Sequence, residues 1–388
     1  MNWKNSFILL CLFSSLSWAS GEVRHYQTYQ RLQMQLQKDP VATLAAIELF
    51  TKQVASADDQ SKQMAAYLQL QACIALNRYS CAANAVEILL ALNQDEARKP
   101  ELLKLSAQLH YQTQSYNTVI NHVQQWLNLS QSQQVSPPAK AWAEMYSLQA
   151  YGQFYLQAYQ PAIVAIERAI KHQKTEQREL FALGLYQQQK DWRNVNRVLK
   201  SLVSAHAHKP EYWEKYAYSF LKLEQQKQAL HALGSAYKAG NLPQRSIILY
   251  AQMLLRFNAP DRAANVLEAH PNLASHAIYN SLLTQSYLLA RDKDNAAKWL
   301  AKSTHKDANI ARGLLAYQQG QWQQVVTLFS SLDVAKKRNH YWLLLAAISE
   351  FELQRWQQAR VAFERLAGTH YDELATQWLS QIDYLTSE

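Results

Sequence analysis

Apolar residues recur every three or four positions along most of the chain, the spacing that places them on one face of an α-helix. The stretch 210–242 shows this most plainly, with two apolar sets separated by a polar break at 224–226: Trp213, Ala217 and Phe220, then Ala229, Leu233 and Ala236. Pro210 suits a first helical position, and Gly240 suits a left-handed residue after a second helix. The stretch therefore predicts two short helices that form a hairpin.

The hairpin pattern repeats along the chain. Each second helix is expected to begin at a position that is often aromatic and to carry a small or β-branched residue three positions later: Tyr79/Ala82, Tyr116/Val119, Tyr159/Ala162, Trp192/Val195, Gln226/Ala229, Pro260/Ala263, Lys293/Ala296, Trp322/Val325 and Trp356/Ala359. These units are spaced by 37, 43, 33, 34, 34, 33, 29 and 34 residues. A large apolar residue follows each small one by four positions: Val86, Val123, Ile166, Leu199, Leu233, Leu267, Leu300, Phe329 and Phe363.

The hairpin at 210–242 reads W-x2-Y-A-x2-F and then A-x3-L-x2-A. It resembles the tetratricopeptide (TPR) repeat, whose signature is W-x2-L-G-x2-Y followed by A-x3-F. Tyr216 and Ala217 stand where Leu and Gly are usual, and Ala217 is nearly as small as glycine. The resemblance implies an all-α fold, a single right-handed α-solenoid of about nine hairpins over residues 62–370.

The two ends are expected to be capping helices. Residues 20–61 predict a helical hairpin over 26–36 and 40–54, with Asp39 as the cap and Pro40 as the first helical residue. Residues 371–388 predict a closing helix with an apolar stripe at Leu374, Trp378, Ile382 and Leu385. Between the caps, the Pro-Pro segment 131–140 predicts an exposed loop, and the 29-residue step predicts a shortened turn across 303–309.

The first nineteen residues have the pattern of an export signal. Lys4 gives a positive start, an apolar run that includes Cys11 follows, and 17–19 form a small-x-small cleavage site ending at Ala19. The apolar run is too short to span a bilayer, and no second long apolar run follows. We expect a periplasmic protein that does not span the membrane once cleaved near Ala19; a retained N-terminal anchor is the alternative.

Composition favours a helical array and argues against several classes of enzyme. Only 8 glycines and 9 prolines occur in 388 residues, and we find no P-loop, Gly-rich dinucleotide fingerprint or G-x-S-x-G motif. No carboxylate pair suggests an acid and a base, so no enzyme and no cofactor are expected. The formal net charge of +9 becomes +8 without Lys4. The sequence contains no run of basic residues of the kind that binds nucleic acid. This charge indicates an anionic partner or only a solvated basic surface.

Cys73 and Cys81 remain after removal of the leader. Exported proteins meet oxidising conditions, so we predict a disulfide between them; the alternative is two small buried residues. Zinc would need more ligands than these two, and no histidine stands at metal-site spacing near them. His206 and His208 lie in a turn between repeats, where an H-x-H pair is usually solvated, so no metal site is expected.

The TPR resemblance also implies which side chains face a partner. In TPR arrays the first helices line the concave side, and five positions of each face the groove. Registered on the small residues, these positions hold aromatic, basic and amide side chains in this sequence: Tyr111, Tyr151, Phe154, Tyr155, Tyr218, Tyr317, Phe351, Arg245, Gln252 and Arg256. The partner-binding residues predicted from this set are Tyr151, Phe154, Tyr155, Tyr218, Arg245, Arg256 and Tyr317, since Tyr and Arg carry binding energy when desolvated. The alternative is that some of these rings pack between neighbouring helices.

A narrower resemblance covers residues 210–268, about 60 of the 388. Its matching positions are Tyr212-Trp213, Leu223, Glu224, Lys227, Leu230, Ala236-Tyr237, Gly240, Pro260, Ala263-Ala264 and Val266-Leu267-Glu268. The stretch is similar to exported TPR proteins encoded beside TonB-type energy-transduction genes in Gram-negative bacteria. It implies a periplasmic accessory factor that binds a protein or peptide, with TonB-system components as candidate partners. The other hypothesis is a TPR protein that binds envelope glycan or lipopolysaccharide.

Overall fold

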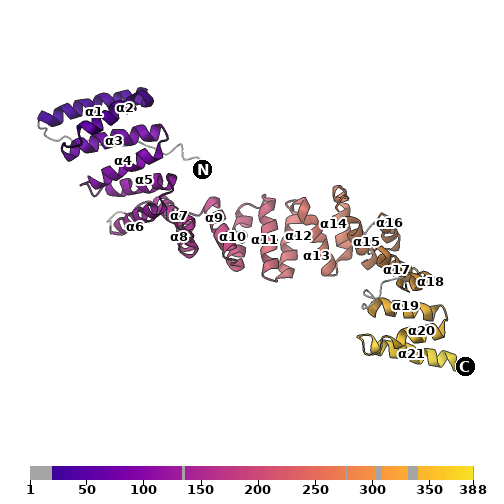
Figure 1. Ribbon diagram of the computed structural model, residues 1–388. Coiled ribbons are helices and arrows are strands. Elements are labelled where there is room, and N and C mark those ends of the chain that lie inside the picture. The colour runs from indigo at the N-terminus through magenta and orange to yellow at the C-terminus, as the bar shows by residue number, and fades with distance from the viewer. Residues whose placement is uncertain (1–19, 133–135, 277, 303–307, 331–339, 388) are drawn as a thin grey trace. The chain divides into compact units, whose positions relative to one another are not determined.

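The computed structural model describes residues 20–132, 136–276, 278–302, 308–330 and 340–387 (Figure 1). Within those ranges the chain is built of α-helices joined by short turns, with one 3-10 helix at Pro271–Leu273 and no strand. The chain divides into an N-terminal unit, up to Val198, and a C-terminal unit, from Leu199 onward. Each unit is a stack of helical hairpins and is described by itself.

The helices of the N-terminal unit form pairs in which each short connection folds the chain back along the preceding helix. They are α1 (Ser20–Lys38), α2 (Pro40–Gln53), α3 (Asp59–Ala75), α4 (Tyr79–Ala91), α5 (Lys99–Gln112), α6 (Tyr116–Ser132), α7 (Ala139–Tyr155), α8 (Tyr159–His172), α9 (Glu176–Gln188) and α10 (Trp192–Ala205), which continues into the second unit.

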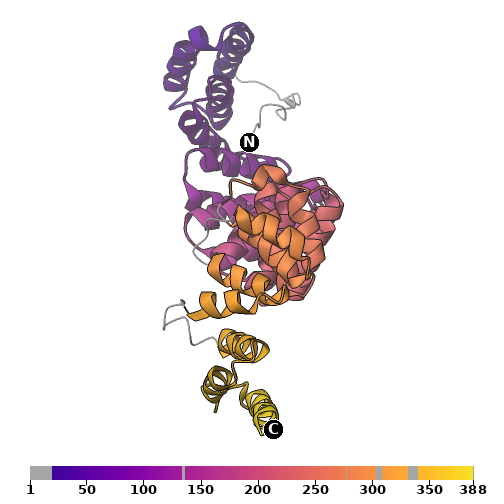
Figure 2. The same ribbon diagram turned by 90° about the vertical axis from the view of Figure 1, so that its right-hand side faces the viewer.

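The C-terminal unit continues the same arrangement, and Figure 1 shows α11 to α14 following one another as two hairpins. Its helices are α11 (Pro210–Lys222), α12 (Gln226–Lys238), α13 (Gln244–Arg256), α14 (Pro260–Glu268), α15 (Tyr279–Leu289), α16 (Lys293–Ala301), α17 (Ala308–Gln318), α18 (Trp322–Ser330), α19 (His340–Glu352), α20 (Trp356–Glu364) and α21 (Asp372–Thr386). In Figure 2 the last three helices lie one beside the next.

The predicted register of the repeat is confirmed. All nine second helices begin at the residue that the sequence pattern predicts, from Tyr79 to Trp356. The small or β-branched residue three positions later is at most 1% exposed in every unit, and the large apolar residue four positions beyond it at most 6%. The burial of these two positions in every unit shows that each second helix turns the same face inward.

One turn geometry joins the two helices of all nine hairpins. The residue two positions before each second helix has a positive φ: Asn77, Gln114, Gln157, Lys190, Glu224, Asn258, Arg291, Gly320 and Gln354. The next amide then donates to the carbonyl five residues back, as from Arg78 to Cys73 at 2.7 Å. This Schellman bond satisfies a carbonyl at the end of the first helix and fixes the length of the turn.

Successive hairpins stack through two kinds of contact. In most hairpins the second helix packs on the next first helix, as α4 on α5 and α14 on α15, and some first helices also contact one another, as α5 with α7 and α13 with α15. These neighbouring first helices lie side by side, and we call the surface formed by the first helices of a unit the first-helix face. The predicted partner-binding residues all lie on first helices.

Helices occupy both of the segments for which capping helices are predicted. Asp39 caps α2 by accepting from the amide of Ala42 at 3.0 Å, as predicted. The stripe predicted for the closing helix is wrong at two positions, since Leu374 and Leu385 are 38% and 41% exposed. The last helix, α21, packs on α20 and also meets α19 through Trp378, whose ring centroid lies 4.8 Å from that of Phe351. Its covered stripe centres on Ile382, which is fully buried.

Several predicted features lie outside the described residues: the export signal 1–19 with Cys11 and Ala19, the middle of the 131–140 loop, and most of the shortened turn 303–309. Among the residues that are described, no helix is both long and apolar enough to cross a membrane.

Candidate partner-binding site

Aromatic side chains from five successive helices meet on the N-terminal unit. We call this group the tyrosine cluster; its members are Tyr111, Tyr116, Tyr151, Phe154, Tyr155, Tyr159 and Phe181. Tyr116 and Tyr155 stack face to face, with ring centroids 4.6 Å apart and planes 6° apart. Tyr111 lies 5.9 Å from Tyr151 and 6.2 Å from Tyr155. The repeat brings these rings together, because Tyr111 and Tyr116 lie on either side of the turn of one hairpin and contact the first helix of the next hairpin.

One ring of the tyrosine cluster, that of Tyr155, is exposed to solvent and also packs against a neighbouring ring. Tyr155 is 52% exposed although one face of its ring is covered by Tyr116. Burial raises the pKa of Tyr111 and Tyr151, so both phenols stay neutral at physiological pH. The surface therefore combines exposed aromatic area with neutral hydroxyl groups that can donate hydrogen bonds.

The structure brings together only part of the predicted binding set. Tyr151, Phe154 and Tyr155 fall within the tyrosine cluster. The members that the sequence did not assign to the binding surface are Tyr116, Tyr159 and Phe181. The repeat pattern predicts Tyr116 and Tyr159 as the first residues of second helices. Their sequence signal is that each follows a turn at the end of a first helix that carries aromatic residues.

In the C-terminal unit the predicted residues are spread over three helices. Tyr218 of α11 is 48% exposed, and the Lys222 ammonium lies 5.1 Å from its ring centroid. Tyr317 of α17 is half-buried and contacts Trp322 edge-on at 5.4 Å. Arg256 is exposed at the end of α13. Lys222 and Trp322 belong to the same helix or hairpin as the tyrosines that they contact, and the three predicted side chains do not form a second aromatic cluster.

Arg245 is engaged within its own unit. Its guanidinium donates to both carboxylate oxygens of Glu214, with Nε 2.7 Å from Oε1, and Ser246 donates to the same Oε1 at 2.7 Å. The hydrogen bonds from Arg245 are the main reason that the pKa of Glu214 lies below its ordinary value. A partner that bound Arg245 would therefore compete with an ion pair that links α11 to α13.

A polar cluster that sequence reasoning missed lies between α4, α5 and α6. Ser106 Oγ donates to Glu87 Oε1 at 2.6 Å and lies 2.8 Å from His122 Nδ1. His110 Nε2 is 3.0 Å from the same carboxylate oxygen. Burial lowers the pKa of His122. The spacings of these residues along the chain match no motif, and only the repeat register places their three helices together.

Cys73 and Cys81 lie on either side of the Schellman turn at Asn77. Their Cα atoms are 5.8 Å apart, and the sulfurs are within bonding distance. Cys73 is fully buried at the end of α3, and Cys81 belongs to the first turn of α4. This geometry suits the predicted disulfide.

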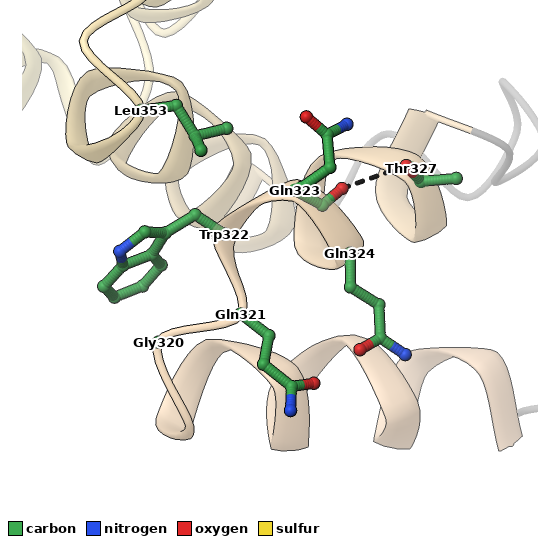
Figure 3. Close-up of a pocket in the computed structure, with 7 residues that line it drawn as sticks. All are labelled: Gly320, Gln321, Trp322, Gln323, Gln324, Thr327 and Leu353. Atoms are coloured by element: carbon green, nitrogen blue, oxygen red, sulfur yellow. Dashed lines mark hydrogen bonds between the residues drawn. The ribbon is translucent and has the colours of Figure 1, made fainter.

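An open hollow of about 650 Å³ lies at the end of the α17–α18 hairpin (Figure 3). It is lined mainly by Gln321, Gln323, Gln324 and Trp322, and Leu353, in the turn after α19, also contributes. Thr327 donates to the backbone carbonyl of Gln323 at 2.9 Å, within α18. None of the residues that line the hollow has an ionisable side chain, and none of them is a predicted partner-binding residue.

Comparison with known proteins adds weak structural likenesses. No family model matches the sequence, and neither does any curated protein. A solved structure of Naa15/Naa10 bound to HypK-THB matches at 13% identity and a TM-score of 0.47, covering 84% of this chain and 52% of that one. A tetratricopeptide repeat protein from Parabacteroides merdae matches at 12% identity and 0.37, covering 67% of this chain and 99% of that one.

The TPR2AB domain of yeast Sti1, solved as a pHSP90 complex, matches at 12% identity and 0.28, covering 58% of this chain and 99% of that one. The chain spans about half the length of the Naa15/Naa10 chain that it matches. Because these TM-scores are all below 0.5, we assign the fold from the buried positions and turns that recur in the nine hairpins. On that register the chain is an all-helical repeat protein with the fold of the TPR type.

Proposed function

We propose that this protein is a non-catalytic periplasmic scaffold that binds a segment of a partner protein on its first-helix face. The observation that carries the proposal is the tyrosine cluster. It offers exposed aromatic area on helices whose backbone is already ordered, so a partner segment can bind with little reorganisation of the host. Tyrosine supplies a large contact area at low cost in side-chain entropy, and this is why it is common in binding surfaces.

The location and the class of partner are proposed from the sequence. The export-type leader favours the periplasm, and the resemblance over 210–268 favours an accessory role in TonB-dependent transport of iron complexes or similar nutrients. Under this proposal a component of the TonB system binds the tyrosine cluster. Envelope glycan or lipopolysaccharide is the ligand that the alternative hypothesis predicts for the same surface.

The binding surface is tested by substituting the stacked pair. Tyr116→Ala with Tyr155→Ala should weaken partner binding by roughly 1–3 kcal/mol for each anchor that the partner desolvates. The matched control is Val164→Ala, a 49% exposed apolar residue on the second helix α8. A photocrosslinking side chain at position 155 should capture the partner in intact envelopes, and one at 164 should not. Equal capture from both positions would place binding elsewhere, and capture of glycan would favour the alternative.

The TonB assignment is tested separately by growth. Deletion of the gene should slow growth on scarce iron complexes, and the Tyr116/Tyr155 double variant should fail to restore it, although its circular dichroism matches that of wild type. Val164→Ala should restore growth fully. Normal iron-limited growth of the deletion strain would exclude the TonB role and leave the binding surface open to the crosslinking test.

A further inference from the structure

Two histidines and one carboxylate that do not belong to the tyrosine cluster converge inside the N-terminal unit. Glu87 comes from α4, His110 from α5 and His122 from α6. One carboxylate oxygen and one ring nitrogen of each histidine all lie within 4.8 Å of one another. Glu87 Oε1 is 3.0 Å from His110 Nε2 and 3.6 Å from His122 Nδ1.

These separations match the geometry of a tetrahedral metal site. Bonds of about 2.0–2.1 Å at tetrahedral angles place neighbouring ligand atoms about 3.3–3.4 Å apart. The two measured separations lie on either side of that value. Two imidazoles with one carboxylate are also a ligand set that Zn²⁺ and similar divalent transition-metal ions use, with the fourth position left for water.

The surroundings of the three side chains fit a metal-binding site better than a catalytic site. The side chains of His110 and His122 are only 13% and 11% exposed, whereas that of Glu87 is 40% exposed and gives a path from solvent. Ser106 is fully buried on α5, so its contact with His122 cannot serve a serine nucleophile that a substrate must reach. Its hydroxyl instead donates to Glu87, the role of an outer-shell group that orients a ligating carboxylate.

We propose that Glu87, His110 and His122 bind one divalent transition-metal ion of the Zn²⁺ class, which joins helices α4, α5 and α6. Ser106 positions the Glu87 carboxylate, and water completes the coordination. With the ion bound to Nε2, the His110 ring proton moves to Nδ1, which is buried and has no hydrogen-bond partner among the described residues. A missing outer-shell partner lowers metal affinity by roughly 10–100-fold, so the site is expected to be weaker than one with a full outer shell.

The test uses the full exported chain, freed of any affinity tag and stripped of metal with a chelator. Isothermal titration with ZnSO₄ should show one equivalent of bound ion, and Zn²⁺ should raise the thermal unfolding midpoint. Co²⁺ substituted at the site should give the visible absorption of a four-coordinate ion. Glu87→Gln and His122→Gln should each abolish the one-to-one binding and the thermal shift.

Two further variants separate a metal site from a structural network. Ser106→Ala keeps all three ligands and should lower the affinity by roughly 10–100-fold while the stoichiometry stays at one. The control is the double variant His206→Gln and His208→Gln, which removes the exposed H-x-H pair and should leave binding unchanged. Loss of binding in that control, binding by Glu87→Gln equal to wild type, or no binding of Zn²⁺ to the stripped chain would each overturn the proposal. The four residues would then be a hydrogen-bonded core network alone.

Discussion

At the scale of single residues, Glu214 connects the ionisation of one side chain to stability. It accepts hydrogen bonds from Arg245 and Ser246 of the next first helix, and these lower its pKa from the ordinary 4.5. The folded carboxylate therefore holds its proton less tightly than the unfolded one. The stabilisation is complete above about pH 4.5 and is lost as the pH falls through the lowered pKa.

The variant that tests this prediction is Glu214→Gln. It should unfold at lower urea concentration than wild type at pH 7, and the difference should shrink as the pH falls below 4.5. Glu211→Gln, an exposed carboxylate on the same helix, is the control and should change the midpoint little at either pH. A Glu214→Gln difference that persists unchanged at pH 3 would show that the loss comes from packing and not from the ion pair.

The cysteine pair gives a second prediction at this scale. In the exported chain Cys73 and Cys81 should show no reactive thiol under denaturing, non-reducing conditions. Closing so short a loop should stabilise by about 2–3 kcal/mol on the chain-entropy model, so Cys81→Ser should lose about that much. The measurement is a thiol titration followed by urea unfolding with and without reductant. Two titratable thiols would contradict the disulfide and would mean that Cys73 and Cys81 are two small packed residues.

At the scale of helices, the close approach of α17 and α18 depends on a residue without a side chain. A Cβ added at Gly313 would lie 2.7 Å from two ring atoms of Phe329, well inside the 3.5–4.0 Å of a normal carbon contact. Five other hairpins carry a fully buried alanine at this register position: Ala107, Ala150, Ala217, Ala251 and Ala347. In this hairpin the large ring of Phe329 occupies the space that the alanine methyl would need.

Gly313→Ala should therefore destabilise the protein by about 1–3 kcal/mol, despite the helix propensity gained. The matched control is Gly184→Ala in α9, where an added Cβ meets no atom within 4 Å and should stabilise by about 0.5–1 kcal/mol. Urea unfolding followed by circular dichroism should give changes of opposite sign. A stabilising Gly313→Ala would mean that Phe329 moves aside at little cost.

The repeat elements could be predicted from sequence because their determinants are local. A helix start, a small residue three positions later and a large one four beyond it all fall within one helix, and together they define the register. The turns were harder to predict, since eight of the nine positive-φ positions hold residues other than glycine, among them Lys190 and Arg291. The Schellman hydrogen bonds and the packing of both helices hold these residues in a conformation that their side chains disfavour.

The candidate sites could be predicted only in part, because they depend on which side chains from different helices meet. The exposure of Tyr155 is set by Tyr116 on another hairpin. Arg245 looked available in the sequence but pairs with Glu214, 31 residues earlier. The group of Glu87, His110 and His122 draws on three helices, so no spacing within one segment reveals it.

At the scale of the whole chain, a stack of hairpins should respond to damage locally. Each hairpin contacts mainly its neighbours, so stability is close to a sum of single-hairpin and neighbour terms. Ile166 is fully buried in α8 of the N-terminal unit, and Ile166→Ala should cost about 2–5 kcal/mol. Hydrogen exchange read by mass spectrometry should lose protection most in α7, α8 and α9, and much less in α3 and α4.

The exposed Val164 on the same helix supplies the control, since Val164→Ala should leave exchange nearly unchanged. Equal loss of protection from α3 to α9 would show that the N-terminal unit unfolds as one cooperative body and not as neighbouring hairpins. The distinction bears on function, because α7 carries Tyr155. If damage stays local, a substitution that loosens α8 should also weaken partner binding without touching the tyrosine cluster. A binding loss in Tyr116→Ala with Tyr155→Ala therefore counts as a lost contact only where the protection of α7 equals that of wild type.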